Sequence, residues 1–136
     1  MDSAIAKALA LGPDSTMADH TVDITTIGAR SGEPRRIEIW FHNVDGAVYL
    51  TGLPGPRSWY ANLIANPRFT FHLKHAVHAD LAATAVPITA PDDRARLFGV
   101  IIRGIDDLYV RRGSRRHVAQ PERWLAESPL VRVEFD

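Results

Sequence analysis

Three strand-forming stretches decide the fold, and they lie within residues 20–51, which read HTVDITTIGARSGEPRRIEIWFHNVDGAVYLT. The β-branched run 20–27 predicts a strand, and the glycines that follow it permit the positive φ angles of a tight connection. A second strand is predicted over 35–42, and Asp45-Gly46 marks a hairpin turn before the return strand. Strand, turn, strand, hairpin and strand together predict an antiparallel meander.

The rest of the chain predicts further strands with short helices between them. Residues 68–74 alternate phenylalanine and leucine with polar side chains, which is typical of a half-buried strand. The expected elements are a helix over 3–11, strands over 20–27, 35–42 and 47–51, a helix over 57–66, strands over 68–74 and 78–89, a helix from Pro91 to Arg103, and a closing strand over 131–135. We therefore expect a mainly β domain over 20–136, preceded by a helical N-terminal arm over 1–19.

Composition excludes several classes of function. The 136 residues and 46% hydrophobic content suit one domain, and lysine plus arginine equals aspartate plus glutamate at 16 each. This balance gives no support to binding of nucleic acid or of an anionic membrane. Absence of cysteine excludes disulfides, thiolate metal sites and a cysteine nucleophile. The first eleven residues lack the charged region of an export signal and are too short to span a bilayer, so we expect a cytoplasmic protein.

Arginines gather near the glycine-rich turns. Arg30, Arg35, Arg36 and Arg57 lie close to these turns, and Ser31 can add a neutral donor beside the free amides of a glycine turn. Arginine offers a planar set of donors for phosphate or carboxylate. The cluster therefore predicts an anion site, although composition alone leaves open the alternative that these arginines are solvated rim residues.

Aromatic residues suggest a ligand pocket. Strand alternation puts Ile37, Ile39 and Phe41 on one face and places Trp40 on the other, together with Arg36, Glu38 and His42. An aromatic ring beside polar groups suits a planar ligand, and the alternative is a tryptophan that covers the edge of a barrel. Trp59 and Tyr60 either wall a pocket or fasten the short helix to the barrel.

Other chemistries find no support in the sequence. His72, His75 and His78 do not share one face of a strand, so we expect no metal site. We find no spacing of serine, histidine and acid typical of a hydrolase. The basic run 111–117 is typical of a solvated connection, and it is also a candidate border for an acidic ligand tail.

Two motifs resemble those of one enzyme family. Residues 24–35 read ITTIGARSGEPR and residues 59–67 read WYANLIANP. They resemble the TT-G-(R/K)-SG-x-PR and WY-x-NL-x-ANP signatures of the deazaflavin-dependent nitroreductase and quinone reductase family, within the flavin/deazaflavin oxidoreductase superfamily. The resemblance is dense over about residues 20 to 75.

The resemblance implies a split β-barrel of the FMN-binding kind that holds coenzyme F-420, a deazaflavin with an acidic tail. It implies that Arg30, Ser31 and Arg35 meet the phosphate or the tail, and that Thr51 and Gly52 lie beside the ring. The cofactor-binding residues expected are Arg30, Ser31, Gly32, Arg35, Arg36, Thr51, Gly52, Arg57, Trp59 and Asn62. The substrate-pocket residues expected are Trp40, Glu38, Thr51, Tyr109 and Trp124, with no metal.

The implied activity is hydride transfer from reduced coenzyme F-420 to a small conjugated acceptor, which is a quinone, an enone or a nitro compound. The alternatives are an FMN-dependent reductase of the same fold and a non-catalytic carrier of the cofactor or of another ligand. Either a monomer or a homodimer is expected.

Three departures from the family limit what is carried over. The loop 53–56 is short, which leaves Arg57 to supply its charge. Tyr109 is the last tyrosine, with His117 and Trp124 as candidate substitutes, so we do not expect activation of nitro drugs. Glu38 stands where a proline is common, either to pair with Arg36 or to supply a proton.

Overall fold

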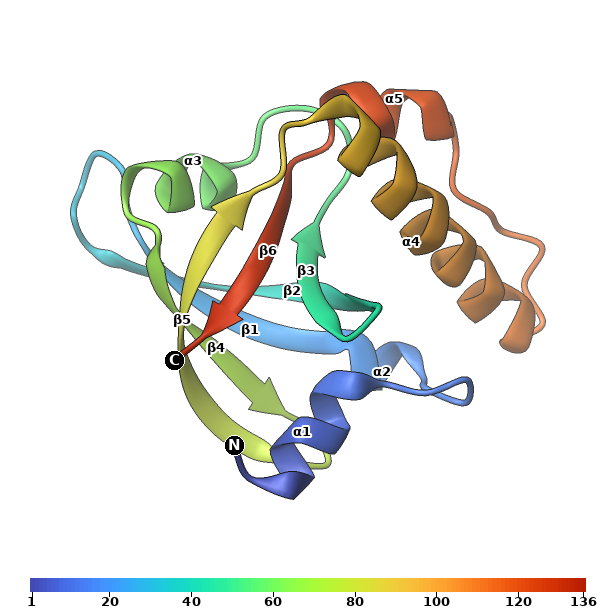
Figure 1. Ribbon diagram of the computed structural model, residues 1–136, viewed down its shortest axis with the longest axis horizontal. Helices are drawn as coiled ribbons and strands as arrows, with labels where there is room; N and C mark the ends of the chain where they lie inside the picture. The colour runs from blue at the N-terminus through green and yellow to red at the C-terminus, as the bar shows by residue number, and fades with distance from the viewer.

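The computed structural model describes residues 1–136 as a closed six-stranded barrel with five helices (Figure 1). All neighbouring strands pair antiparallel in the order β1-β2-β3-β6-β5-β4. The elements are α1 (Ser3–Ala10), α2 (Met17–His20), β1 (Thr21–Ile27), β2 (Pro34–Val44), β3 (Ala47–Thr51), α3 (Ser58–Ala65), β4 (Arg68–Lys74), β5 (His78–Pro87), α4 (Pro91–Arg111), α5 (Pro121–Glu127) and β6 (Leu130–Phe135). The predicted mainly β barrel is confirmed, and every expected strand lies within two residues of its predicted bounds.

Side-chain alternation fills the barrel interior. Along β1, Val22 and Ile24 are buried while their neighbours are half-exposed. Phe71 of β4 lies at the centre, where its ring meets those of Phe41 and Phe135 edge to face at centroid distances of 5.5 and 5.2 Å. Such edge-to-face pairs stabilise a core beyond the area they bury. The interior is therefore packed with side chains, and ligand space lies at its ends and outside its wall.

Helix α4 forms a second core outside the barrel. Pro91 at its first position and Asp92 and Asp93 in its first turn suit the positive end of a helix. Its buried side chains recur at helical spacing; they are Leu97, Phe98, Ile101, Ile102, Ile105 and Leu108. All of these except Leu108 belong to a core cluster with Val44 of β2 and Tyr49 of β3. The predicted end at Arg103 is wrong, because this apolar stripe continues for two more turns to Arg111.

Two short helices were not predicted. A capping box between Thr16 and Asp19 starts α2, in which each side chain accepts from the other residue's backbone amide. Pro121 starts α5, and Trp124 anchors that helix in the second core. As Figure 1 shows, α1 and α2 lie at one end of the barrel, and α3 and α5 lie at the other.

The predicted helix 3–11 is confirmed as α1, which packs on the barrel through buried Leu9. The side chain of Asn43 donates to the Leu9 carbonyl at 2.9 Å and fixes this contact. No helix of the molecule combines the length and apolar character that a membrane crossing requires.

Candidate functional site

The loop between β1 and β2 is a tight, self-bonded turn. The Gly28 amide donates to the Glu33 carbonyl at 2.8 Å, and the Gly32 amide donates to the Gly28 carbonyl at 2.9 Å. Gly32 has a φ of +69°, in the left-handed region that favours glycine. The Ser31 hydroxyl lies directly over Gly28, where a side chain would collide with it. The backbone of the loop therefore favours glycine at position 32, whereas a side chain at position 28 would require Ser31 to rotate.

Asn62 of α3 clamps this loop from behind. Its side-chain oxygen accepts from the Ala29 amide at 2.9 Å, and its side-chain nitrogen donates to the Thr26 hydroxyl at 3.1 Å. Asn62 is buried, so loss of either bond would leave a polar group unsatisfied. The asparagine of the WYANL motif thus couples the short helix to the loop 28–33.

Above the loop lies a pocket of about 580 Å³, which we call the loop pocket. It is lined by Thr26, Gly28, Ala29, Arg30, Ser31, Arg35, Ile37, Ser58, Trp59, Ala61 and Asn62. The amides of Arg30 and Ser31 donate to no protein group, whereas the loop's other four amides are bonded. The Arg35 guanidinium has only a long, exposed ion pair with Glu33 at 3.8 Å. Two cations and two free amides make the pocket suitable for an anion.

A larger pocket of about 810 Å³, the aromatic pocket, lies between β2, β3, α4 and α5. It is lined by Ile39, Trp40, His42, Thr51, Gly52, Leu53, Pro54, Arg57, Ile105, Tyr109, Arg116, His117, Val118, Ala119, Gln120, Arg123 and Trp124. Four of the five expected substrate-pocket residues meet here, namely Trp40, Thr51, Tyr109 and Trp124. Asp106 holds the segment that closes the pocket, because its carboxylate accepts from the Val118 amide at 2.7 Å.

The two pockets are neighbours. Trp59 lines the loop pocket, and its indole lies 3.9 Å from the position that a Cβ on Gly52 of the aromatic pocket would take. Ile37 and Ile39, which point to the same side of β2, line one pocket each. Thr51 is fixed at the junction, since its hydroxyl donates to the Pro129 carbonyl at 2.6 Å. The loop pocket and the aromatic pocket therefore share a wall.

Arg36 and Glu38 lie away from both pockets, on the outer face of the barrel. The Arg36 side chain donates to Asp23 at 3.0 Å, and Lys74 bridges Asp23 and Glu38. Although desolvation favours the neutral acid, the hydrogen bonds from Lys74 and Arg36 hold the pKa of Asp23 below its ordinary value. The suggested Arg36–Glu38 pair does not form, because Lys74 of β4 reaches across β1 to Glu38 instead. Gly32 shapes the loop without lining a pocket.

A histidine that the sequence reasoning did not single out lies in the aromatic pocket. His42 is buried and makes no hydrogen bond with another protein group. Burial, with a smaller contribution from His20, lowers the pKa of His42 to about 3. The ring is therefore neutral at pH 7 and offers one donor and one acceptor to whatever fills the pocket. Strand alternation puts His42 on the same face as Trp40, and this pattern could have indicated that His42 lines the pocket.

His72 belongs to a polar line across the outer sheet. Its two ring nitrogens lie 2.7 Å from the Thr25 hydroxyl and 2.7 Å from an Asp80 oxygen. The order hydroxyl, imidazole, carboxylate is that of a hydrolase triad, but the surrounding main chain is paired in the β1–β4 and β4–β5 ladders. No free amides remain beside Thr25 to stabilise an oxyanion. The structure brings no three His, Cys, Asp or Glu side chains together as a metal site.

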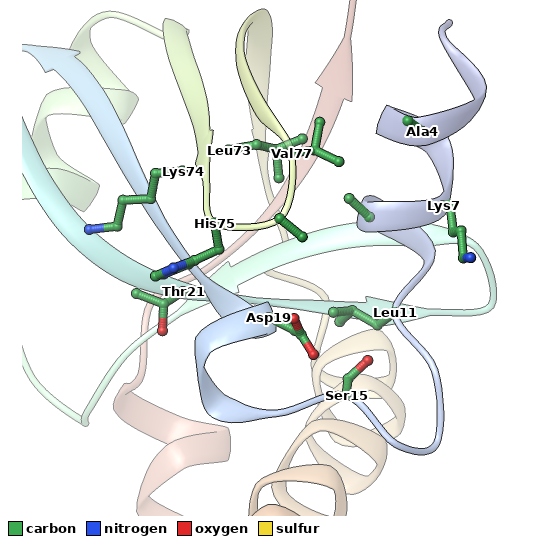
Figure 2. Close-up of a pocket in the computed structure, with 12 residues that line it drawn as sticks. Ala4, Lys7, Leu11, Ser15, Asp19, Thr21, Leu73, Lys74, His75 and Val77 are labelled. Carbon is green, nitrogen blue, oxygen red and sulfur yellow. The ribbon is translucent and has the colours of Figure 1, made fainter.

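A third pocket, of about 390 Å³, lies between the N-terminal helices and the turn joining β4 to β5 (Figure 2). Four of its polar side chains, those of Ser15, Asp19, Thr21 and Lys74, are already engaged within the protein. Ser15 accepts from the Gly12 amide at 2.7 Å, and Asp19 accepts from the Thr16 amide at 2.8 Å. Lys74 points away from the helices, toward its two carboxylate partners. None of the residues that line this cavity lines the loop pocket or the aromatic pocket.

The chain has counterparts among known proteins. Residues 7–118 match the family model described as "F420H(2)-dependent quinone reductase". No curated protein matches the chain in sequence. The family match covers both motif segments and the whole of α4, and it includes every residue that lines the two pockets except Ala119, Gln120, Arg123 and Trp124.

Solved structures share the fold at low sequence identity. An F420-H2 dependent reductase is 20% identical with a TM-score of 0.54, and the match covers 85% of this chain and 94% of that one. A FAD-binding protein from Mesorhizobium loti is 10% identical with a TM-score of 0.63, covering 100% and 91%. A domain-swapped dimer is 21% identical with a TM-score of 0.55, covering 85% and 80%. With most of its length matched by the family model, the chain belongs to this quinone reductase family and is a reductase that depends on coenzyme F-420.

Proposed function

We propose that this chain reduces a small conjugated acceptor, a quinone, enone or nitro compound, with the reduced deazaflavin as hydride source. The observation that carries the proposal is the shared wall between the loop pocket and the aromatic pocket, at Trp59 and Gly52. An anionic tail and an aromatic ring of one molecule need such neighbouring sites. A hydride donor and its acceptor also have to meet in one cavity.

We propose that the loop pocket holds the phosphate and acidic tail of the cofactor. Arg30 and Arg35 offer charged donors, and the free amides of Arg30 and Ser31 add neutral ones. Trp59, Gly52 and Thr51 lie toward the ring. The donor set fits a polyanion, because the two exposed guanidiniums and two amides provide more donors than one phosphate requires.

When bound, the reduced deazaflavin supplies the hydride from its own ring carbon. The chain itself binds and orients the cofactor and the acceptor and shields them from water. Trp40, Tyr109 and Trp124 line the aromatic pocket and would shield an acceptor bound there from water on their side. The neutral His42 ring would offer a hydrogen bond to an oxygen of an acceptor bound in this pocket.

The FMN alternative keeps the same pockets, since one phosphate would also suit Arg30 and Arg35. The structural similarity to a FAD-binding protein supports the FMN alternative. A carrier would bind cofactor and turn over no acceptor. We propose a homodimer ahead of a monomer, because one neighbour of this fold is a domain-swapped dimer.

The test is titration of the purified protein with coenzyme F-420 and with FMN, followed by anaerobic turnover of the reduced deazaflavin with menadione. We expect tighter binding of F-420 and reoxidation that depends on menadione. Arg30→Ala and Arg35→Ala should weaken F-420 binding, and Arg36→Ala is the matched control because its side chain lies on the outer face. Tighter binding of FMN, or binding without turnover, would favour the corresponding alternative.

A further inference from the structure

The aromatic pocket is lined by more basic than acidic residues. Its lining contains three arginines, Arg57, Arg116 and Arg123, and contains no aspartate or glutamate. The whole chain, in contrast, has equal numbers of basic and acidic residues. The nearby carboxylate of Asp106 is engaged by the Val118 amide. The cavity that would hold an acceptor is therefore locally positive.

Only one of these arginines has a carboxylate partner. Arg123 pairs with Glu127 at 2.7 Å. Arg57, which is half-buried, donates only to the carbonyls of Pro56 at 3.0 Å and Pro54 at 3.3 Å. The Arg116 guanidinium lies over the Tyr109 ring, 5.9 Å from its centroid. Carbonyls and a ring face orient these two cations without neutralising their charge.

The cofactor tail has a separate set of donors in the loop pocket. Neither Arg57 nor Arg116 lines that pocket, and Trp59 stands between the two cavities. Two uncompensated guanidiniums beside apolar aromatic walls suit a ligand that is planar at one end and anionic at the other.

We propose that the acceptor site selects planar conjugated molecules bearing an anionic group, such as a carboxylate or an ionised enol, and that Arg57 and Arg116 bind that group. The proposal rests on the proposed function, because it takes the aromatic pocket to be the acceptor site. Arg57 supplies the inner contact and Arg116 supplies the contact at the rim.

The test is direct calorimetric binding of naphthoate and naphthamide to the protein loaded with oxidised F-420. These ligands have the same shape and differ in charge, and neither accepts a hydride. We expect naphthoate to bind at least about fivefold more tightly, the scale of one partly exposed charge contact. Arg116→Ala and Arg57→Gln should each collapse this ratio. Arg115→Ala, the neighbouring arginine outside the lining, should leave the ratio unchanged.

Two outcomes would overturn the inference: equal affinities for naphthoate and naphthamide, or Arg57 and Arg116 variants that lose F-420 affinity and keep the ratio. Menadione turnover separates this inference from the proposed function, because menadione carries no charge. A protein that prefers naphthoate and yet never reoxidises reduced F-420 with menadione or with a carboxylated naphthoquinone would refute the proposed reductase chemistry and still support an anionic-ligand pocket.

Discussion

Acidification offers the sharpest physical test of the pocket, through His42. The folded protein holds the pKa of this ring at about 3, against an ordinary value of 6.5. Between these two values the unfolded chain binds a proton that the folded chain does not, so the free energy of unfolding falls as pH falls. The stability that the neutral His42 ring gives to the folded protein is present above pH 6.5 and is fully lost below pH 3.

The size of the effect follows from linkage at about 1.36 kcal/mol per pH unit. At about pH 5 the loss is about 2 kcal/mol, and this figure hardly changes for any folded pKa below about 4. The carboxyls with lowered pKa, Asp23, Asp80 and Asp136, act in the same direction but only below the ordinary aspartate value of 3.8. Between pH 6.5 and 4, the change in the free energy of unfolding therefore reports on the buried histidines.

Urea unfolding at several pH values would measure this slope. His42→Gln should flatten most of it and leave a smaller slope from His20, whose pKa burial also lowers. His117→Gln, at the exposed rim of the same pocket, is the matched control and should retain the wild-type slope. If His42→Gln lost stability on acidification as steeply as the wild type, the assignment of a neutral, desolvated ring to the pocket would be refuted.

Three further predictions concern the pockets. Arg30→Ala and Arg35→Ala should each weaken F-420 binding by about 1.5–3 kcal/mol in a fluorescence titration, with Arg36→Ala unchanged and apo melting temperatures unaltered. Trp40→Ala should lower turnover and change the preference between a quinone and an enone, and it should reduce F-420 affinity less than it reduces turnover. An equal loss of turnover with all acceptors, together with a large drop in melting temperature, would instead show that this tryptophan has a structural role. Asn62→Ala should cost about 2 kcal/mol of unfolding free energy, because it leaves the buried Thr26 hydroxyl and the partly buried Ala29 amide without their partner, and it should also weaken F-420 binding. Unchanged affinity would show that the loop keeps its shape without the Asn62 contacts.

Local pattern predicted the strands well and the C-terminal helices poorly, and the difference has a physical cause. Alternation and glycine turns act over a few residues, so they are visible in the sequence. Helix α5 is only seven residues long and depends on distant contacts. The Arg94 guanidinium of α4 donates to the carbonyls of Trp124, Leu125 and Ser128 at 3.3, 3.0 and 2.6 Å and so fixes the end of that helix. The sequence of residues 121–127 gives no indication of this contact with Arg94.

The site shows the same limit at the level of one strand. Alternation correctly placed Glu38, Trp40 and His42 on one face of β2, but one face of a strand in a closed barrel passes through different surroundings. Beside Glu38 lies Lys74 of β4, which binds its carboxylate. Over Trp40 and His42 lies α4, and the space between them is the aromatic pocket. The covering element decides whether a side chain is a surface ion pair or a pocket wall. The role of Glu38 thus depended on a contact from β4, thirty-six residues away in sequence.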